Sequence, residues 1–211
     1  TMMAINAATG ARVNLNKEDL ITFSKLREQA GLTNGEIYGI QQLSTLNNKT
    51  LEETNIELLG AAKAYAGKNK LAINEKEILK DVSKASESLK LSFGGKLAEA
   101  AIKTRQFGLN LEQAEKMASS LLNFESSIEN ELSAELITGK NLNLEKARGL
   151  ALSGDVAGAA EEMAKQMGSA AEFGKMNVIQ QEALAKAVGM GRDELSKSLM
   201  DKQMLTKLGV K

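Results

Sequence analysis

The densest set of side chains that could do chemistry is a run of glutamates in the stretch from Ser120 to Asp155. It contains Glu125, Glu129, Glu131 and Glu135 on what the spacing predicts to be one helix. Two carboxylates held apart in a cleft act as general acid and base, and carboxylates on helices of a bundle bind metal ions. The glutamates are therefore either a site or only the solvent-facing side of a helix.

The rest of the composition argues against a site. The chain has no His and no Cys, which removes the usual general base, the commonest zinc ligand and thiolate metal sites. Carboxylate sites in helical bundles use a Glu-x-x-His pair, and calcium loops alternate Asp or Asn with a Gly, and neither pattern occurs. The sequence thus predicts no catalytic residues, no cofactor, no metal site and no enzyme. A cell-wall-degrading enzyme remains a third alternative, although sugar sites are usually lined by aromatic side chains and the chain has no Trp and two Tyr.

Charge and hydropathy argue against nucleic acids as partners and against a membrane-spanning helix. Lys plus Arg and Asp plus Glu both number 27, so no net field attracts DNA or RNA, and direct nucleic-acid binding is not expected. Gly94-Gly95-Lys96 lacks the spacing and the following Ser or Thr of a phosphate-binding loop. No apolar run reaches the length of about 18 residues that a transmembrane helix needs.

The elements that must position these side chains are helices. Pro is absent and aromatic residues make up 3% of the chain, so Leu, Ile, Ala and Met must fill the core, as in helix-on-helix packing. Apolar residues recur every three or four positions, and no alternating pattern indicates a strand. We therefore predict an all-α fold, an array or bundle of short helices joined by Gly and Asn turns. The predicted helices span 17–30, 34–47, 51–68, 75–90, 95–107, 111–137, 143–152, 155–167, 170–174, 177–188 and 192–207.

Capping patterns mark the ends of these helices. Capping boxes are predicted at Thr50–Glu53, Asn74–Glu77, Asn110–Gln113 and Ser169–Glu172. Glycines predicted to end helices in the left-handed conformation are Gly31, Gly67, Gly108, Gly139, Gly168 and Gly189. We expect a flexible N-terminal segment over 1–15, an N-terminal helical subdomain over 16–91 and a second helical region over 92–211. The chain opens with Thr and not Met, so we interpret it as a fragment or processed piece of a longer protein.

The longest predicted helix, 111–137, carries the glutamates. Its apolar stripe runs from Leu111 through Leu121 to Ile128 and Leu132 and is predicted to face the core. The glutamates lie beside this stripe, so we interpret them as the solvent-facing side of the helix. An acidic surface that meets a basic partner is the weaker alternative, and its candidate contact residues are Glu125, Glu129, Glu131 and Glu135.

Residues of about 90–200 resemble a segment of bacteriophage tail tape-measure and related virion structural proteins, especially those of large marine myoviruses. The most telling parts are "LLNFESSIENELSAELITGKNLNLEKAR", Leu121 to Arg148, and "MNVIQQEALAKAVGMGRDEL", Met176 to Leu195. The resemblance implies a structural role in the phage tail, where tape-measure proteins fill the tube and set its length. It offers no catalytic residues. The glycines and caps break the chain into short helices, which favours a compact helical domain carried on a longer tape over a continuous ruler.

Two functional hypotheses lead. The first is a tail tape-measure segment that acts by helical packing and self-association, located in the virion and assembled in the host cytoplasm. Its partners would be further copies, the tail tube, the baseplate hub and assembly chaperones, with membrane contact only during ejection. The second is a soluble helical interaction module, an adaptor or assembly chaperone. It would dock through the acidic helix and the Met-rich C-terminal part, which contains Met190, Met200 and Met204.

Overall fold

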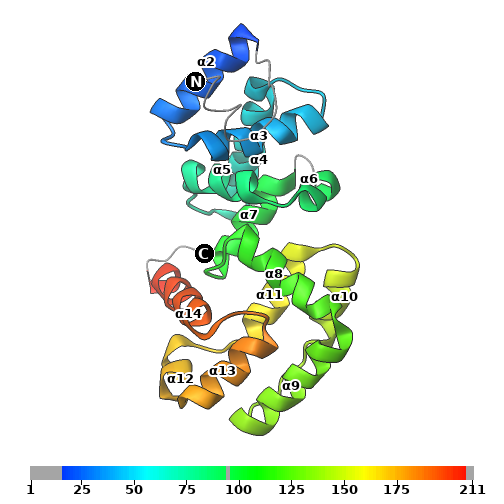
Figure 1. The fold of residues 1–211 in the computed structure, drawn as a ribbon. Coiled ribbons are helices and arrows are strands. Elements are labelled where there is room, and N and C mark those ends of the chain that lie inside the picture. The colour runs from blue at the N-terminus through cyan, green and yellow to red at the C-terminus, as the bar shows by residue number, and fades with distance from the viewer. Residues whose placement is uncertain (1–15, 94–95, 208–211) are drawn as a thin grey trace. The chain divides into compact units, whose positions relative to one another are not determined.

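The computed structural model describes residues 16–93 and 96–207, and the regular structure in these ranges is helical, without a β-strand (Figure 1). This confirms the predicted all-α array. The predicted flexible segment 1–15 and the Gly94-Gly95 pair lie outside the described residues. In chain order the helices are α2 (Lys17–Glu28), α3 (Asn34–Leu46), α4 (Leu51–Asn69), α5 (Glu75–Lys84), α6 (Glu87–Phe93), α7 (Leu97–Gln106), α8 (Leu111–Leu122), α9 (Phe124–Thr138), α10 (Glu145–Leu152), α11 (Val156–Gln166), α12 (Ala170–Lys175), α13 (Val178–Ala187) and α14 (Arg192–Lys207).

The chain forms two compact units, Thr1–Ile102 and Lys103–Lys211. The division falls within α7, whereas the sequence placed a boundary between residues 91 and 92. Each unit has its own buried apolar residues and is described by itself.

In the first unit, α3 packs against α4 and α5, and α2 packs against α4. The largest fully buried side chains include Phe23, Ile37, Ile40 and Leu58. Gly39 makes the close approach of α3 and α5 feasible, because a Cβ at this position would collide with the Ser83 carbonyl.

In the second unit, α8 packs against α10 and α11, α9 packs against α13, and α14 contacts α12 and α13. Met117, Leu121, Met163, Leu184 and Leu195 are fully buried there. The core is thus built from aliphatic and thioether side chains, as the small aromatic content implies.

The helix ends follow the predicted capping chemistry with two exceptions. Capping boxes form at Thr50, Asn110 and Ser169, whereas Asn74 accepts a hydrogen bond from Glu77 N, which is half of a capping box. The predicted glycines have positive φ apart from Gly67, which lies inside α4. That helix ends instead with Lys70 in the left-handed conformation.

The predicted helix 111–137 is wrong, because the chain breaks there into α8 and α9. Asn123 leaves the helical conformation with φ −82° and ψ 82°, and its side-chain oxygen accepts a hydrogen bond from Ser126 N. An Asn that caps in this way starts a new helix in a new direction. The predicted helix 75–90 likewise divides into α5 and α6, with Ala85 in a non-helical conformation between them.

Candidate functional site

The outer face of α9 carries a row of large apolar side chains that the protein leaves exposed. Phe124 is 45% exposed, Ile128 46%, Leu132 54% and Leu136 87%. These residues lie four positions apart, so they form one of the ridges by which helices pack into the grooves of other helices. We call these four residues the α9 ridge. Exposed apolar patches on folded proteins often mark sites where another molecule binds.

The inner face of α9 is built from small residues. Ser127 and Ala134 are buried, and α13 is the helix that packs most extensively against α9. The side chain of Gln180, in the first turn of α13, donates a hydrogen bond of 3.2 Å to the Ile137 carbonyl in the last turn of α9. The two helices therefore run antiparallel, and small side chains allow their close approach.

Two of the glutamates hold the chain that follows α9. Glu131 Oε1 accepts a hydrogen bond of 2.8 Å from Leu144 N, and Glu135 Oε1 accepts one of 2.8 Å from Leu142 N. The other oxygen of Glu131 pairs with the guanidinium of Arg148, and both side chains are largely buried. Arg148 Nε also donates to Ser127 Oγ at 3.2 Å. These bonds fix the segment between α9 and α10 against α9.

The four candidate glutamates therefore separate into two pairs. Glu125 and Glu129 are exposed, as predicted, but Glu131 and Glu135 point into the unit, so the prediction that they face solvent is wrong. The prediction that Ile128 and Leu132 face the core is also wrong, because they belong to the exposed ridge. The physical reason is the break at Asn123, which ends the stripe of α8 and lets α9 turn a different face inward.

Sequence reasoning missed Arg148, Ser127 and Asn123. Asn123 followed by a new helical turn is a recognisable N-cap signal, and it could have located the break. Ser127 and Ala134 give no hydrophobic signal for an inner face, since small and polar residues at helical spacing are typical of exposed surfaces. The pairing of Arg148 with Glu131 depends on the fold alone.

The surface beside the ridge is acidic. Glu125 and Glu129 are exposed, and α9 contains no Lys or Arg. Near the end of α9, the first turn of α13 adds exposed apolar side chains, Val178 and Ile179. The Met-rich end, the other predicted docking element, divides in the same way: Met190 is buried, whereas Met200 and Met204 are exposed on α14.

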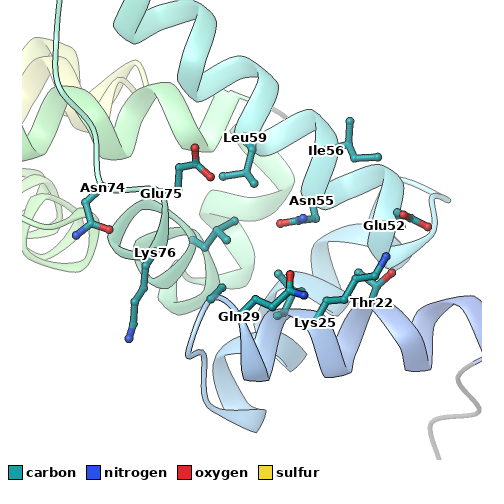
Figure 2. A pocket seen from close by; sticks show the side chains of 13 residues that line it. Thr22, Lys25, Gln29, Glu52, Asn55, Ile56, Leu59, Asn74, Glu75 and Lys76 are labelled. Atoms are coloured by element: carbon teal, nitrogen blue, oxygen red, sulfur yellow. The ribbon is translucent and has the colours of Figure 1, made fainter.

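A second candidate site lies in the first unit, in a cleft between α2 and α4 that the start of α5 closes at one end (Figure 2). Its volume is about 540 Å³, within the usual range for ligand pockets. Figure 2 shows Lys25 and Gln29 of α2 facing Glu52 and Asn55 of α4 across this space. The cleft is thus lined by polar and charged groups together with the apolar side chains of Leu26, Ile56, Leu59 and Leu79.

Glu172 and Lys202 are among the titrating groups of the second unit whose pKa values are shifted. Hydrogen bonding from Ser169 N, and next the ion pair with Lys140, lower the pKa of the Glu172 carboxyl below its usual value. Burial lowers the pKa of Lys202, whose Nζ donates a hydrogen bond of 3.1 Å to the Ala164 carbonyl. Both groups join elements of the unit to one another, and neither belongs to the ridge.

Within residues 16–93 and 96–207, no group of three or more Asp or Glu side chains is arranged to hold a metal ion. Over the same ranges, no helix combines the length and the apolar character that crossing a membrane requires. No family model, curated protein or solved structure matches this chain. Its function must therefore be inferred from the surfaces that the two units present.

Proposed function

We propose that this chain is a helical protein-binding module and that it docks a helix of another protein on the α9 ridge. The observation that carries the proposal is the exposure of four large apolar residues in a row on a helix whose other side is held in place. The rise of 1.5 Å per residue spreads the ridge over about 18 Å, enough to meet three turns of a partner helix. Binding of an amphipathic helix along an apolar surface is a common mode of recognition.

The charges beside the ridge favour a basic partner. Glu125 and Glu129 are exposed next to the apolar side chains, so Lys or Arg beside the apolar face of a partner helix would be complementary to them. A second copy docked through the same ridge would bring acidic α9 helices together without any basic residue on either. The surface thus favours a different protein over a second copy of this chain.

The test uses two fluorescent peptides as probes, each a helix of about 18 residues with a Leu face. One carries Lys beside the Leu face and the other carries Glu. We expect the full chain to bind the Lys peptide and not the Glu peptide, as measured by fluorescence anisotropy. The variant Ile128→Ser/Leu132→Ser should weaken binding by tenfold or more, about 1.4 kcal/mol.

Leu152→Ser is the matched control, because Leu152 is a comparably exposed apolar residue on α10, outside the ridge. It should leave binding unchanged. The double charge reversal Glu125→Lys/Glu129→Lys should exchange the preference, so that the Glu peptide binds better. Equal binding by the ridge variant and the parent chain would contradict the proposal, and binding of both peptides alike would contradict the charge argument. Binding only to lipid vesicles would assign the ridge to membranes instead.

A second candidate is the tail tape-measure segment, which the sequence resemblance favours. The two most telling stretches, residues 121–148 and 176–195, contain α9 and α13, which pack against each other in the second unit. On this proposal the α9 ridge would dock another tail protein during assembly. Mass spectrometry of purified virions should then detect the native protein, and its presence only in host cytoplasm would contradict this assignment.

The compact first unit leads to a specific expectation for the tape-measure proposal, namely that residues 51–90 do not set tail length. Residues 51–90 belong to α4, α5 and α6 of this unit and do not form one extended helix. Deleting their codons from the parent gene should leave tail length unchanged or abolish assembly, as seen by electron microscopy. Tails shorter by about 60 Å, the rise of a continuous helix over the deleted residues, would instead indicate a ruler segment.

A further inference from the structure

The exposed apolar surface does not stop at the end of α9. Gln180, in the first turn of α13, donates its hydrogen bond of 3.2 Å to the Ile137 carbonyl in the last turn of α9, so these two turns lie against each other. Val178 and Ile179 belong to the same turn of α13 and are 53% and 66% exposed. Ile137 is itself exposed and follows Leu136, the most exposed residue of the α9 ridge. The apolar surface therefore passes from α9 onto α13.

The first turn of α13 is held in place by polar bonds. Asn177 Oδ1 accepts a hydrogen bond of 3.0 Å from Gln180 N, and Asn177 N donates one of 3.1 Å to Gln180 Oε1. The side chain of Gln181 donates to the Phe173 carbonyl at 3.0 Å. These bonds use the backbone and amide groups only. The apolar side chains of this turn are thus presented to solvent from a backbone that is already fixed, which lowers the entropic cost of binding to them.

The two ends of this surface differ in charge. At the start of α9, Glu125 and Glu129 are exposed, and the helix has no Lys or Arg. At the other end, exposed charges of both signs occur, with Lys175 before α13 and with Glu182 and Lys186 on it. The acidic character is therefore confined to one end of the surface, and the other end is apolar with balanced charges.

We propose that the α9 ridge and the first turn of α13 together bind one continuous amphipathic helix of the partner, in a single direction. The Lys or Arg residues of that helix gather at one end and lie over Glu125 and Glu129. Its apolar face continues at the other end, over Val178 and Ile179. A helix docked the other way would place its basic end away from both glutamates. The proposal rests on the proposed function of the ridge and states the partner's chemistry more closely.

The probe for direction is a helical peptide of about 20 residues, about 30 Å long, with a Leu face throughout. Its N-terminal half carries Lys beside this face, and its C-terminal half carries Gln. A spin label is attached to one end or to the other, and NMR measures the broadening of backbone amide signals in the isotope-labelled full chain. We expect the label at the Lys end to broaden the Glu125 signal, and the label at the Gln end to broaden that of Ile179.

A second peptide, with Lys in the C-terminal half and Gln in the N-terminal half, should reverse this pattern, because the charge and not the chain direction selects the orientation. Equal broadening of both signals by each label would show that the peptide docks in both directions. Either that result or an unchanged pattern with the second peptide would overturn the proposal.

The extension onto α13 is tested by the variant Val178→Ser/Ile179→Ser. It should weaken binding of the first peptide by about tenfold, as measured by fluorescence anisotropy. The matched control is Met200→Ser/Met204→Ser, which changes two apolar residues of similar exposure, 58% and 60%, on α14. It should leave binding unchanged. Both variants should keep the melting temperature of the parent chain, since the four side chains are exposed. The same loss of binding in both variants would contradict the extension.

The failure of this proposal can be told apart from the failure of the ridge as a docking site. A loss of binding in Ile128→Ser/Leu132→Ser without any loss in Val178→Ser/Ile179→Ser would confine the partner to α9 and overturn only the extension. An absence of binding by either peptide to the parent chain would overturn both.

Discussion

Helices α8 and α9 follow each other along the chain and use similar residues in opposite ways. α8 buries its apolar side, including Leu111, Met117 and Leu121, between α10 and α11. α9 turns Ser127 and Ala134 inward and leaves its four-residue ridge outside. This difference shows that helical periodicity identifies an apolar face, but the packing of neighbouring helices decides whether that face is buried or exposed.

The inner sides of the two helices are also stabilised by different forces. α8 is held by burial of apolar area, which has no preferred direction. α9 is held in part by directional hydrogen bonds from Glu131 and Glu135 and by the ion pair with Arg148. Stability and binding should therefore respond in opposite ways to substitutions in the two helices.

The largest contrast is expected between leucines of the two helices. Leu121→Ala removes a fully buried side chain and should lower the free energy of unfolding by about 2–5 kcal/mol. Leu132→Ala removes a side chain that is half exposed and should change it by less than about 0.5 kcal/mol. Urea unfolding followed by circular dichroism measures both, and a large loss in Leu132→Ala would mean that the ridge is part of a core.

A smaller loss is expected when the ion pair of α9 is broken. Arg148→Ala leaves Glu131 without its cation in a largely buried place and should lower the free energy of unfolding by about 3 kcal/mol. Glu129→Gln, on the exposed side of the same helix, is the control and should have no measurable effect. Similar unfolding curves for these two variants would show that the inner polar bonds do not stabilise α9.

The next prediction concerns the break between α8 and α9 and its effect on stability. Asn123→Ala removes the side chain that caps α9 and should lower the free energy of unfolding by about 1 kcal/mol. Asn123→Ser retains a capping oxygen and should restore most of the loss. If Asn123→Ala were more stable than the parent chain, α8 and α9 would prefer to join as one helix.

The smallest effect concerns the pH dependence of stability that Glu172 causes. This residue lies on α12 and pairs with Lys140, in the segment after α9. The lowered pKa of Glu172 means that its ionised form stabilises the folded state, with the full contribution present above the unfolded pKa near 4.5. That contribution is lost as the pH falls through the folded pKa. In Glu172→Gln the stability should depend less on pH below 4.5, and an identical pH dependence would contradict the role of this carboxylate.

The sequence was sufficient for the helical class and for most helix ends, because capping residues such as Thr50 and Asn110 act locally. It failed at Asn123 and Ala85, where the helices are broken although apolar residues continue at helical spacing. It also misplaced Ile128, Leu132, Glu131 and Glu135, since their orientation depends on the distant residues Arg148 and Leu144. The cleft could not be predicted, because α2 and α4 are brought together by the tertiary contact between Asp19 and Leu51.

The polar bonds on the inner side of α9 have a consequence for how this protein can change. Glu131, Glu135 and Arg148 make polar bonds on the inner side of α9 that do not involve the ridge residues, so the position of the helix depends less on the ridge. Residues 124, 128, 132 and 136 can therefore diverge between relatives, or be redesigned, while the unit keeps its fold. Partner choice would then evolve at four surface positions, independently of folding.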